Sequence, residues 1–186
     1  MLNSFFVPLA PVVLPYRGRQ LYMGEIDAAH ISMPAGFEDY LGPVVDLLEA
    51  ADLRKGQVFM TVDEKVVQPG MSQRRPGPHV DGCFDPVAIG WGHDHPTWNH
   101  FCNHLPVARM PVIVAASVAG CKAWEGTFDA VPKNNGDLSH LQLGEGIMLS
   151  ANTGYLLSPD CVHESLTFDQ PTKRSFLRLA LPVGTI

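Results

Sequence analysis

Apolar and polar positions follow a helical period in one part of this sequence. Between Pro43 and Leu53, apolar residues recur at the spacing i, i+3, i+4 and i+7, as Val44, Leu47, Leu48 and Ala51. This spacing places them in a single stripe along a helix. Pro43 suits the first helical turn, where its missing N–H costs nothing, and Gly56 suits the position after a helix end. The pattern predicts a helix over Pro43–Leu53.

Other segments show the period of two that is typical of strands. Over Gln57–Val67, one face of the predicted strand holds Val58, Met60 and Val62 and the other Phe59, Thr61 and Asp63. Further short runs, bounded by turn residues, predict strands at Gln20–Met23, Ala29–Met33, Met110–Ala119, Ile147–Leu149, Gly154–Leu157, Cys161–Phe168 and Arg174–Leu181. One helix followed by about eight short strands indicates a mainly β fold, a sandwich or barrel of jelly-roll type with one or two flanking helices.

Length and composition agree with this fold class. The chain has 186 residues, and a domain typically has about 150. We therefore expect a single domain, 1–186, with a β core at 57–182 and an inserted loop at 83–106. The 17 Gly and 16 Pro residues are typical of many turns between short strands.

Charge and cysteine content restrict the class of partner. Lys and Arg number 13 against 19 Asp and Glu, so the formal net charge is −6, which argues against binding along a nucleic-acid backbone. No apolar run reaches the roughly 18 residues of a membrane-spanning helix. The four cysteines form no C-x-x-C pair, as expected for reduced thiols in a cytoplasmic protein. We expect a cytoplasmic protein with a small-molecule or modified-residue substrate and no membrane partner. The sequence leaves the oligomeric state open, a homodimer included.

Two histidines and an aspartate are the most informative residues. His79 and Asp81 are separated by one residue, so they lie on the same face of a strand. His163 falls near the start of a later predicted strand. Two imidazoles and one carboxylate can bind one metal ion and leave half of an octahedron open, an arrangement suited to iron(II) and O₂. We predict these three residues as metal ligands.

Two arginines follow on the last predicted strand. Arg174 lies eleven residues after His163, and an antiparallel return over this distance would bring it back beside that histidine. A buried guanidinium needs an anionic partner, and its strand contains no Asp or Glu. We expect a small dicarboxylate at the metal to be this partner. Arg178 shares the same strand face and is a candidate to hold cofactor or a second anion. Together with Arg74 and Arg75, it could hold an anionic group of the substrate.

In combination, His79-x-Asp81, His163 and Arg174 resemble the motif of the iron(II)/2-oxoglutarate-dependent dioxygenase family, over Gln57–Pro182. The stretch RRPGPHVDG also looks like the iron-site strand of small oxygenase-like proteins. The resemblance implies a double-stranded β-helix in which the two histidines and the aspartate bind iron(II). It also implies that 2-oxoglutarate chelates the iron, with its distal carboxylate on Arg174. The implied reaction couples oxidative decarboxylation of 2-oxoglutarate to hydroxylation of a substrate.

One position departs from that family, which often has Ser or Thr two residues after this arginine. Here the position is Phe176. The departure concerns how the distal carboxylate is held and leaves the iron ligands unaffected. A cupin-like metal enzyme that uses the same three ligands without 2-oxoglutarate therefore stays an alternative, as does a nucleophilic pair formed by Cys161 and His163.

A second cluster of histidines offers a different metal site. The segment Gly92–His104 contains Cys102 and four histidines, His93, His95, His100 and His104. The i, i+4 spacing of the last two is compatible with zinc. This favours, as an alternative, a noncatalytic β-sandwich binding protein with structural zinc. If the segment is instead a loop over the active-site mouth, Trp91, Trp98 and Phe101 are candidates to line the substrate entrance.

Overall fold

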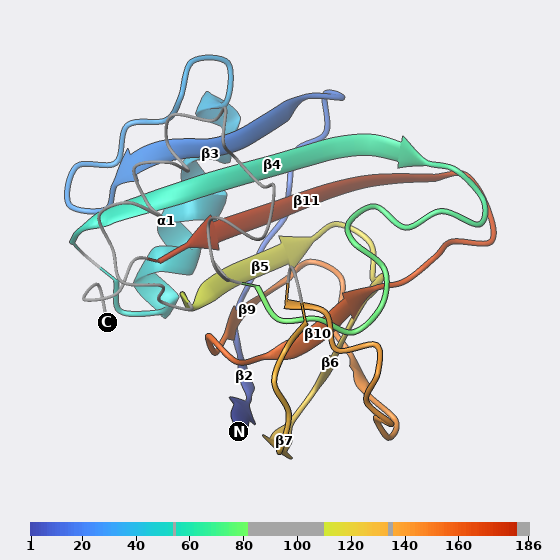
Figure 1. Ribbon diagram of the computed structural model, residues 1–186. Helices are drawn as coiled ribbons and strands as arrows, with labels where there is room; N and C mark the ends of the chain where they lie inside the picture. Colours follow the sequence, from blue (N-terminus) through green and yellow to red (C-terminus); the bar gives the residue numbers. More distant parts are fainter. Residues whose placement is uncertain (54, 82–109, 134–135, 182–186) are drawn as a thin grey trace.

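The computed structural model describes residues 1–53, 55–81, 110–133 and 136–181, and within them the fold is mainly β (Figure 1). One α-helix, α1 (Leu41–Ala50), follows the 3₁₀ turn η1 (Glu38–Tyr40) in this part of the chain. The strands are β1 (Leu2–Ser4), β2 (Phe6–Pro11), β3 (Gln20–Asp27), β4 (Gln57–Val67), β5 (Val112–Ala116), β6 (Cys121–Trp124), β7 (Gly126–Phe128), β8 (Ile147–Met148), β9 (Thr153–Leu157), β10 (Val162–Ser165) and β11 (Thr172–Ala180). No helix among the described residues is long and apolar enough to cross a membrane.

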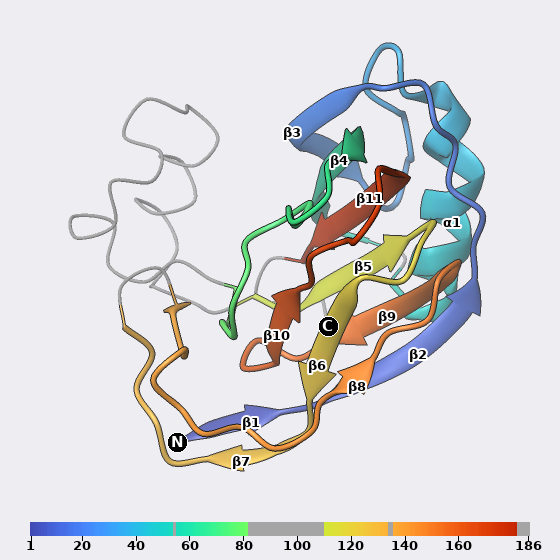
Figure 2. The same cartoon turned by 90° about the vertical axis from the view of Figure 1, so that its right-hand side faces the viewer.

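The strands of the described ranges form antiparallel sheets. The large sheet has the order β2-β9-β5-β11-β4-β3, a smaller sheet has the order β10-β6-β8, and β1 pairs with β7. Figure 2 shows α1 on one side of the large sheet and β6 and β10 on the other. The mainly β class with antiparallel sheets and one helix is thus confirmed.

Strand β11 shows how side-chain alternation assigns the two faces of the large sheet. Leu177 and Leu179 pack in one hydrophobic cluster with Leu47 of α1. Phe176 and Ala180, at the alternate positions, belong to a second cluster on the opposite face. Because successive strand residues point to opposite faces, the arginines at 174 and 178 share the face of Phe176, away from the helix.

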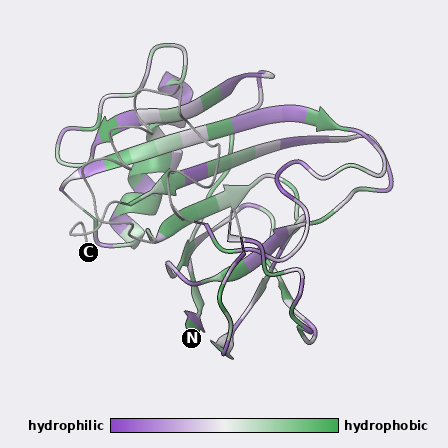
Figure 3. Ribbon diagram, in the orientation of Figure 1, coloured by the Kyte–Doolittle hydropathy of each residue, from purple (hydrophilic) through white to green (hydrophobic). Residues whose placement is uncertain are grey.

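Strand β4 has the predicted bounds and the predicted alternation. Val58, Met60 and Val62 pack on the helix side, and Phe59 packs on the other side. Figure 3 shows hydrophobic residues throughout β5 and a hydrophilic stretch in β4 before its C-terminal end. That stretch is Asp63–Lys65, so the apolar core gives way to polar contacts along the same strand.

The helix is present, but its predicted bounds are wrong. It begins at Leu41, directly after η1, so that Pro43 is its third residue. It ends at Ala50 because Asp52 takes a positive φ of 55°, and the N–H of Leu53 bonds the carbonyl of Leu48 at 2.8 Å. This is the closure of a left-handed helix end, which an aspartate forms here in place of Gly56.

The strand predicted at Ala29–Met33 is absent, because the chain turns after β3. Asp27 bonds the backbone N–H of Ala29 through Oδ1 at 2.9 Å, and its carbonyl accepts the N–H of His30 at 3.2 Å. This side-chain-to-backbone turn replaces the extended ladder. The remaining predicted strands are confirmed within β3, β4, β5, β8, β9, β10 and β11, whereas β1, β2, β6 and β7 were not predicted.

Candidate metal site

Two histidines face each other across a short antiparallel contact. The N–H of His79 bonds the carbonyl of His163 at 2.9 Å, and the N–H of His163 bonds the carbonyl of His79 at 2.9 Å. Residues that exchange both bonds lie directly opposite each other, with side chains on the same face. The ring centroids are accordingly 4.5 Å apart. The backbone around His79 thus pairs with strand β10, and this pairing brings the two imidazoles together.

Backbone carbonyls orient both imidazole rings. Nδ1 of His79 lies 2.7 Å from the carbonyl oxygen of Gly77, and Nδ1 of His163 lies 3.0 Å from that of Cys161. Because a carbonyl can only accept, each Nδ1 donates and each Nε2 keeps its lone pair for a metal. Burial, with His163 as the next cause, lowers the pKa of His79 to about 3. A neutral imidazole is the form that binds metal.

Asp81 completes the group, as the one-residue spacing predicted. One ligand atom from each of His79, Asp81 and His163 lies within 4.8 Å of the others, so the three can hold a metal ion. Burial alone would raise the pKa of Asp81, but Arg178 and the two histidines hold it well below its usual range. The carboxylate is therefore ionised and ready to bind a cation.

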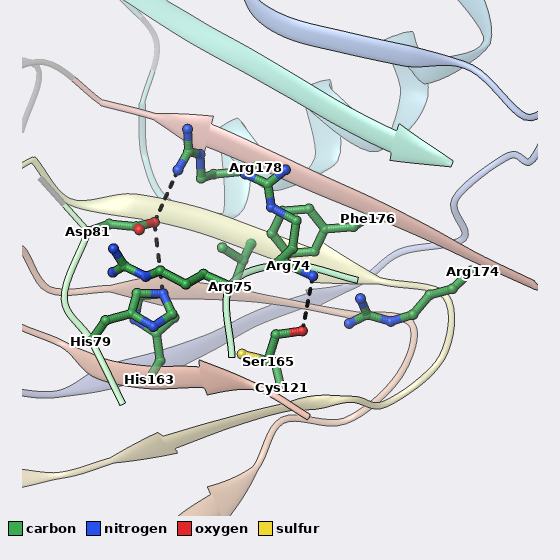
Figure 4. A pocket seen from close by; sticks show the side chains of 11 residues that line it. Arg74, Arg75, His79, Asp81, Cys121, His163, Ser165, Arg174, Phe176 and Arg178 are labelled. Carbon is green, nitrogen blue, oxygen red and sulfur yellow. Dashed lines mark hydrogen bonds and ion pairs between the residues drawn. The ribbon is translucent and has the colours of Figure 1, made fainter. Parts of the chain in front are cut away.

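The triad opens into a pocket between the large and small sheets (Figure 4). The space within the pocket measures about 550 Å³, a volume that includes adjoining open solvent. Strand β11 contributes Arg174, Phe176 and Arg178, and Val114 of β5 lies beside them. The opposite wall contains Cys121, His163 and Ser165. A metal at the triad would thus have its open side toward a chamber with polar and aromatic walls.

Arg174 lines the same pocket, but the predicted return beside His163 is wrong. Strand β10 belongs to the small sheet, whereas β11 pairs with β4 and β5 in the large sheet. Arg174 therefore faces the pocket from the opposite wall (Figure 4). It is only 1% exposed, and burial lowers its pKa to about 10, which leaves it cationic at neutral pH.

Protein groups fix the Arg174 guanidinium on two sides. Nε donates to the carbonyl of Val118 at 2.8 Å, and Nη1 donates to the side-chain oxygen of Gln73. The amide nitrogen of Gln73 donates in turn to the carbonyl of Asp63 at 2.5 Å. Two of the five N–H groups of a guanidinium are thus used, and the guanidinium makes no further hydrogen bond to the described residues. The backbone carbonyl of Arg174 also accepts a bond from the amide nitrogen of Gln73 at 3.4 Å.

Arg178 lies beside Asp81. Its Nη1 is 3.2 Å from Oδ2 of Asp81, and its Nη2 lies 3.8 Å from Sδ of Met23. Its buried Nε has no hydrogen-bond partner among the residues that the structure describes. The predicted role in cofactor or anion binding stays a prediction, and the contact observed is to a candidate metal ligand.

The sequence predicted no role in the site for Ser165 and Phe176, which line the pocket, or for Gln73, which bonds Arg174. Ser165 lies two residues after His163 on β10, and Phe176 lies between the two arginines on β11, so strand alternation could have placed both. Gln73 is 4% exposed, and it lies in a segment whose pattern gave no indication of burial. Only the three-dimensional contact with Arg174 identifies it.

Two alternative sites were predicted from the sequence, the histidine-rich segment and a Cys161–His163 pair. The histidine-rich segment 92–104, its aromatic residues and the inserted loop 83–106 lie outside the described residues. Cys161 is described, and burial raises the pKa of its thiol to about 12. Since the thiolate is the nucleophile, this disfavours a Cys161–His163 nucleophilic pair.

Comparisons with protein-family models, with curated proteins and with solved structures gave no match.

Proposed function

We propose that this chain is an iron(II)- and 2-oxoglutarate-dependent oxygenase with a double-stranded β-helix core. The observation that supports it is one pocket that contains both a three-residue metal triad and a buried arginine on the facing sheet. A triad alone fits many metal enzymes. A buried cation with donors to spare, across a pocket from that triad, favours a second anionic ligand.

The residues fit iron(II) by the chemistry of their donors. Two neutral imidazoles and one carboxylate occupy half of an octahedral coordination shell and leave the other half for exogenous ligands. Bound iron(II) and 2-oxoglutarate would supply oxygen activation, coupled to decarboxylation of the 2-oxo acid. The carbonyls of Gly77 and Cys161 hold the two rings in orientation. Arg178 keeps Asp81 ionised.

Arg174 is the proposed partner of the distal carboxylate of 2-oxoglutarate. Gln73 and Val118 hold the guanidinium in place before the ligand arrives, which reduces the entropy lost on binding. The rings of Phe168 and Phe176 lie with centroids 5.8 Å from its central carbon. These rings shield the guanidinium from water, which strengthens a charge-assisted bond.

The setting we propose is the cytoplasm. Cys121 and Cys161 are free thiols, as expected where glutathione keeps cysteines reduced. The iron(II) of the proposed site also favours a reducing compartment.

Turnover of labelled 2-oxoglutarate tests the function. With iron(II) and ascorbate, the protein should release labelled CO₂ from [1-¹⁴C]2-oxoglutarate, and 2-oxoglutarate should raise its melting temperature. In the variant Arg174→Gln, the affinity for 2-oxoglutarate should fall by tenfold or more, since a charge-assisted bond is lost. Arg17→Gln is the matched control, because Arg17 is 67% exposed and pairs with Asp39.

Two results would contradict the proposal. If 2-oxoglutarate neither raises the melting temperature nor is decarboxylated, the oxygenase is excluded. If metal still binds at the triad in that case, the cupin-like enzyme without 2-oxoglutarate becomes the better function. If Arg174→Gln and Arg17→Gln bind 2-oxoglutarate equally, Arg174 is not its anchor.

A further inference from the structure

The charge of the pocket exceeds what the proposed metal and cofactor require. Among the described lining residues, one carboxylate, Asp81, faces the three arginines Arg74, Arg174 and Arg178. Iron(II) and dianionic 2-oxoglutarate cancel each other's charge, so the excess of guanidinium groups persists when both are bound. Cations removed from water are stable only beside anionic partners. The described residues of the pocket therefore favour binding of a further anion.

Among the described residues, Arg74 has only weak anionic compensation, from Asp81 and Asp63. Its nearest carboxylate contact is Oδ2 of Asp63, at 3.9 Å from Nη1. That same oxygen is 3.1 Å from Nζ of Lys65, and the other oxygen accepts a hydrogen bond from Gln20 at 2.9 Å. Asp63 is thus neutralised mainly by Lys65, and Arg74 keeps most of its charge for the pocket.

Arg178 brings a second guanidinium to the same part of the pocket. Figure 4 shows its side chain and that of Arg74 reaching the same side, and burial followed by the charge of Arg178 lowers the pKa of Arg74. Arg178 is 8% exposed, and its Nε lacks a hydrogen-bond partner within the described ranges. A buried donor without an acceptor is costly. An anionic oxygen between the two groups would supply that acceptor and offset their repulsion.

The surface next to these arginines is apolar. The central carbon of Arg74 lies 5.5 Å from the centroid of the Phe176 ring, and Val114 lines the pocket beside it. The backbone N–H of Arg74 donates to Oγ of Ser165 at 3.3 Å, which fixes the base of the side chain. The subsite thus combines a cationic end with an aromatic wall, as sites for small organic acids do.

We propose that the substrate is a small organic anion, with a carboxylate or phosphate group held by Arg74 and Arg178 and an apolar part against Phe176. The proposal rests on the proposed function, because it assigns the metal triad and Arg174 to the reaction. It adds the chemical class of the molecule that occupies the rest of the pocket. Arg74 is then a specificity-determining residue.

Binding of simple probes tests this class. The protein is loaded with Mn²⁺, and benzoate, benzamide and inorganic phosphate are titrated calorimetrically, both with and without saturating 2-oxoglutarate. Benzoate and benzamide have nearly the same shape and differ in charge. We expect benzoate to bind at least tenfold more tightly than benzamide. The Arg74→Gln variant should lose that tenfold, whereas Arg17→Gln, which removes the same charge at an exposed position outside the pocket lining, should keep it. Tighter binding of phosphate than of benzoate would assign the phosphate class.

Each outcome decides one of the two proposals. Equal affinity of benzoate and benzamide, no binding of either anion, or equal affinity in Arg74→Gln and Arg17→Gln would overturn the anionic substrate. Charge-selective binding that depends on Arg74, in a protein that fails to bind 2-oxoglutarate, would support the anion subsite and overturn the oxygenase. If Arg74→Gln does not fold, the comparison of benzoate with benzamide on the natural chain still decides.

Discussion

At the residue scale, Asp81 contacts both a candidate metal ligand and an arginine of the pocket. Its carboxylate contacts Arg178 at 3.2 Å and Nε2 of His163 at 3.8 Å. In the absence of metal, the arginine supplies the balancing charge. A divalent cation at the triad would take over much of this role, and Arg178 would then be available to another anion. The aspartate would thereby couple metal binding to the charge of the pocket.

Removing this carboxylate should abolish metal binding. Asp81→Ala leaves two imidazoles, which bind a divalent ion far more weakly than the full triad does. We expect the metal content after loading and desalting to fall from one ion per chain to near zero. The far-UV circular dichroism should be unchanged, since Asp81 lies outside the strands. Glu164→Ala is the control, because Glu164 neighbours His163 without belonging to the triad.

Retention of a full complement of metal by Asp81→Ala would exclude the triad. Loss of metal from His100→Ala/His104→Ala would assign the metal to the histidine-rich segment.

The hydrogen bonds of Gln73 to Arg174 and Asp63 should contribute to the free energy of unfolding. Gln73→Leu removes the acceptor of Arg174 Nη1 and the donor to Asp63, leaving buried polar groups unpaired. The free energy of unfolding should fall by about 1–3 kcal/mol, as measured by urea denaturation. Gln68→Leu, at an exposed position, should change it by less than about 0.5 kcal/mol. Equal effects of the two substitutions would show that the Gln73 contacts contribute nothing.

The candidate site could be predicted from the sequence only as far as strand alternation reaches. The one-residue gap between His79 and Asp81 was sufficient to place both on one face, and the structure brings His163 to them. The position of Arg174 was reached for the wrong reason, because eleven residues were taken as a hairpin and instead connect two sheets. The role of Gln73 depends on a contact across 101 residues, which no local pattern encodes.

At the scale of elements, strands were predicted more accurately than ends and turns. Strand β4 has its predicted bounds because its helix-facing positions, Val58, Met60 and Val62, are apolar, whereas the other face becomes polar after Phe59, at Thr61 and Asp63, which gives a regular alternation. The helix stripe was also visible, but its end depends on the backbone conformation of Asp52, a residue that adopts either hand at modest cost. Short strands such as β1 and β7 contain too few residues to establish a period.

The packing of α1 on the large sheet depends on a glycine in β9. A Cβ atom at Gly154 would lie 2.0 Å from Cδ2 of Leu47, a buried helix residue with little room to move. Gly154→Ala should therefore lower the free energy of unfolding by about 1–3 kcal/mol, measured by thermal or urea denaturation. Gly42→Ala, within α1 and with nothing within 4 Å of its Cβ, should instead raise it by roughly 0.5–1 kcal/mol. A neutral Gly154→Ala would mean that helix and sheet are more loosely packed than this contact implies.

At the scale of the whole molecule, the site depends on pairings between distant segments. Strand β2 pairs with β9 and β1 with β7, each across more than a hundred residues. The contact between His79 and His163, which brings two candidate metal ligands together, also joins segments that are far apart in the sequence. The hydrophobic pattern identifies the buried face of a strand and does not identify its neighbours, so the mainly β class was predictable whereas the strand order was not.

The stability of the metal-free protein should consequently depend on pH through His79. In the folded chain its pKa is lowered to about 3, against an ordinary value of 6.5. Between these two pH values the unfolded chain binds the extra proton, so acidification favours unfolding. The contribution of His79 is fully present above pH 6.5 and decreases as the pH falls, by about 1 kcal/mol per pH unit. Asp81, whose pKa is also lowered, adds a loss below its ordinary value of 3.8.

Urea denaturation at pH 7.5, 6.5, 5.5 and 4.5, after removal of metal with a chelator, measures this slope. His79→Gln should flatten it, because a neutral amide does not titrate. His30→Gln should leave it unchanged, since the His30 side chain is 88% exposed. The free energy of unfolding should fall more steeply with decreasing pH in the metal-loaded protein than in the metal-free one, because protons and the metal compete for the same imidazole nitrogens. Identical slopes in His79→Gln and the natural chain would place His79 in contact with water in the folded state. The burial of His79 that lowers its pKa would then be excluded.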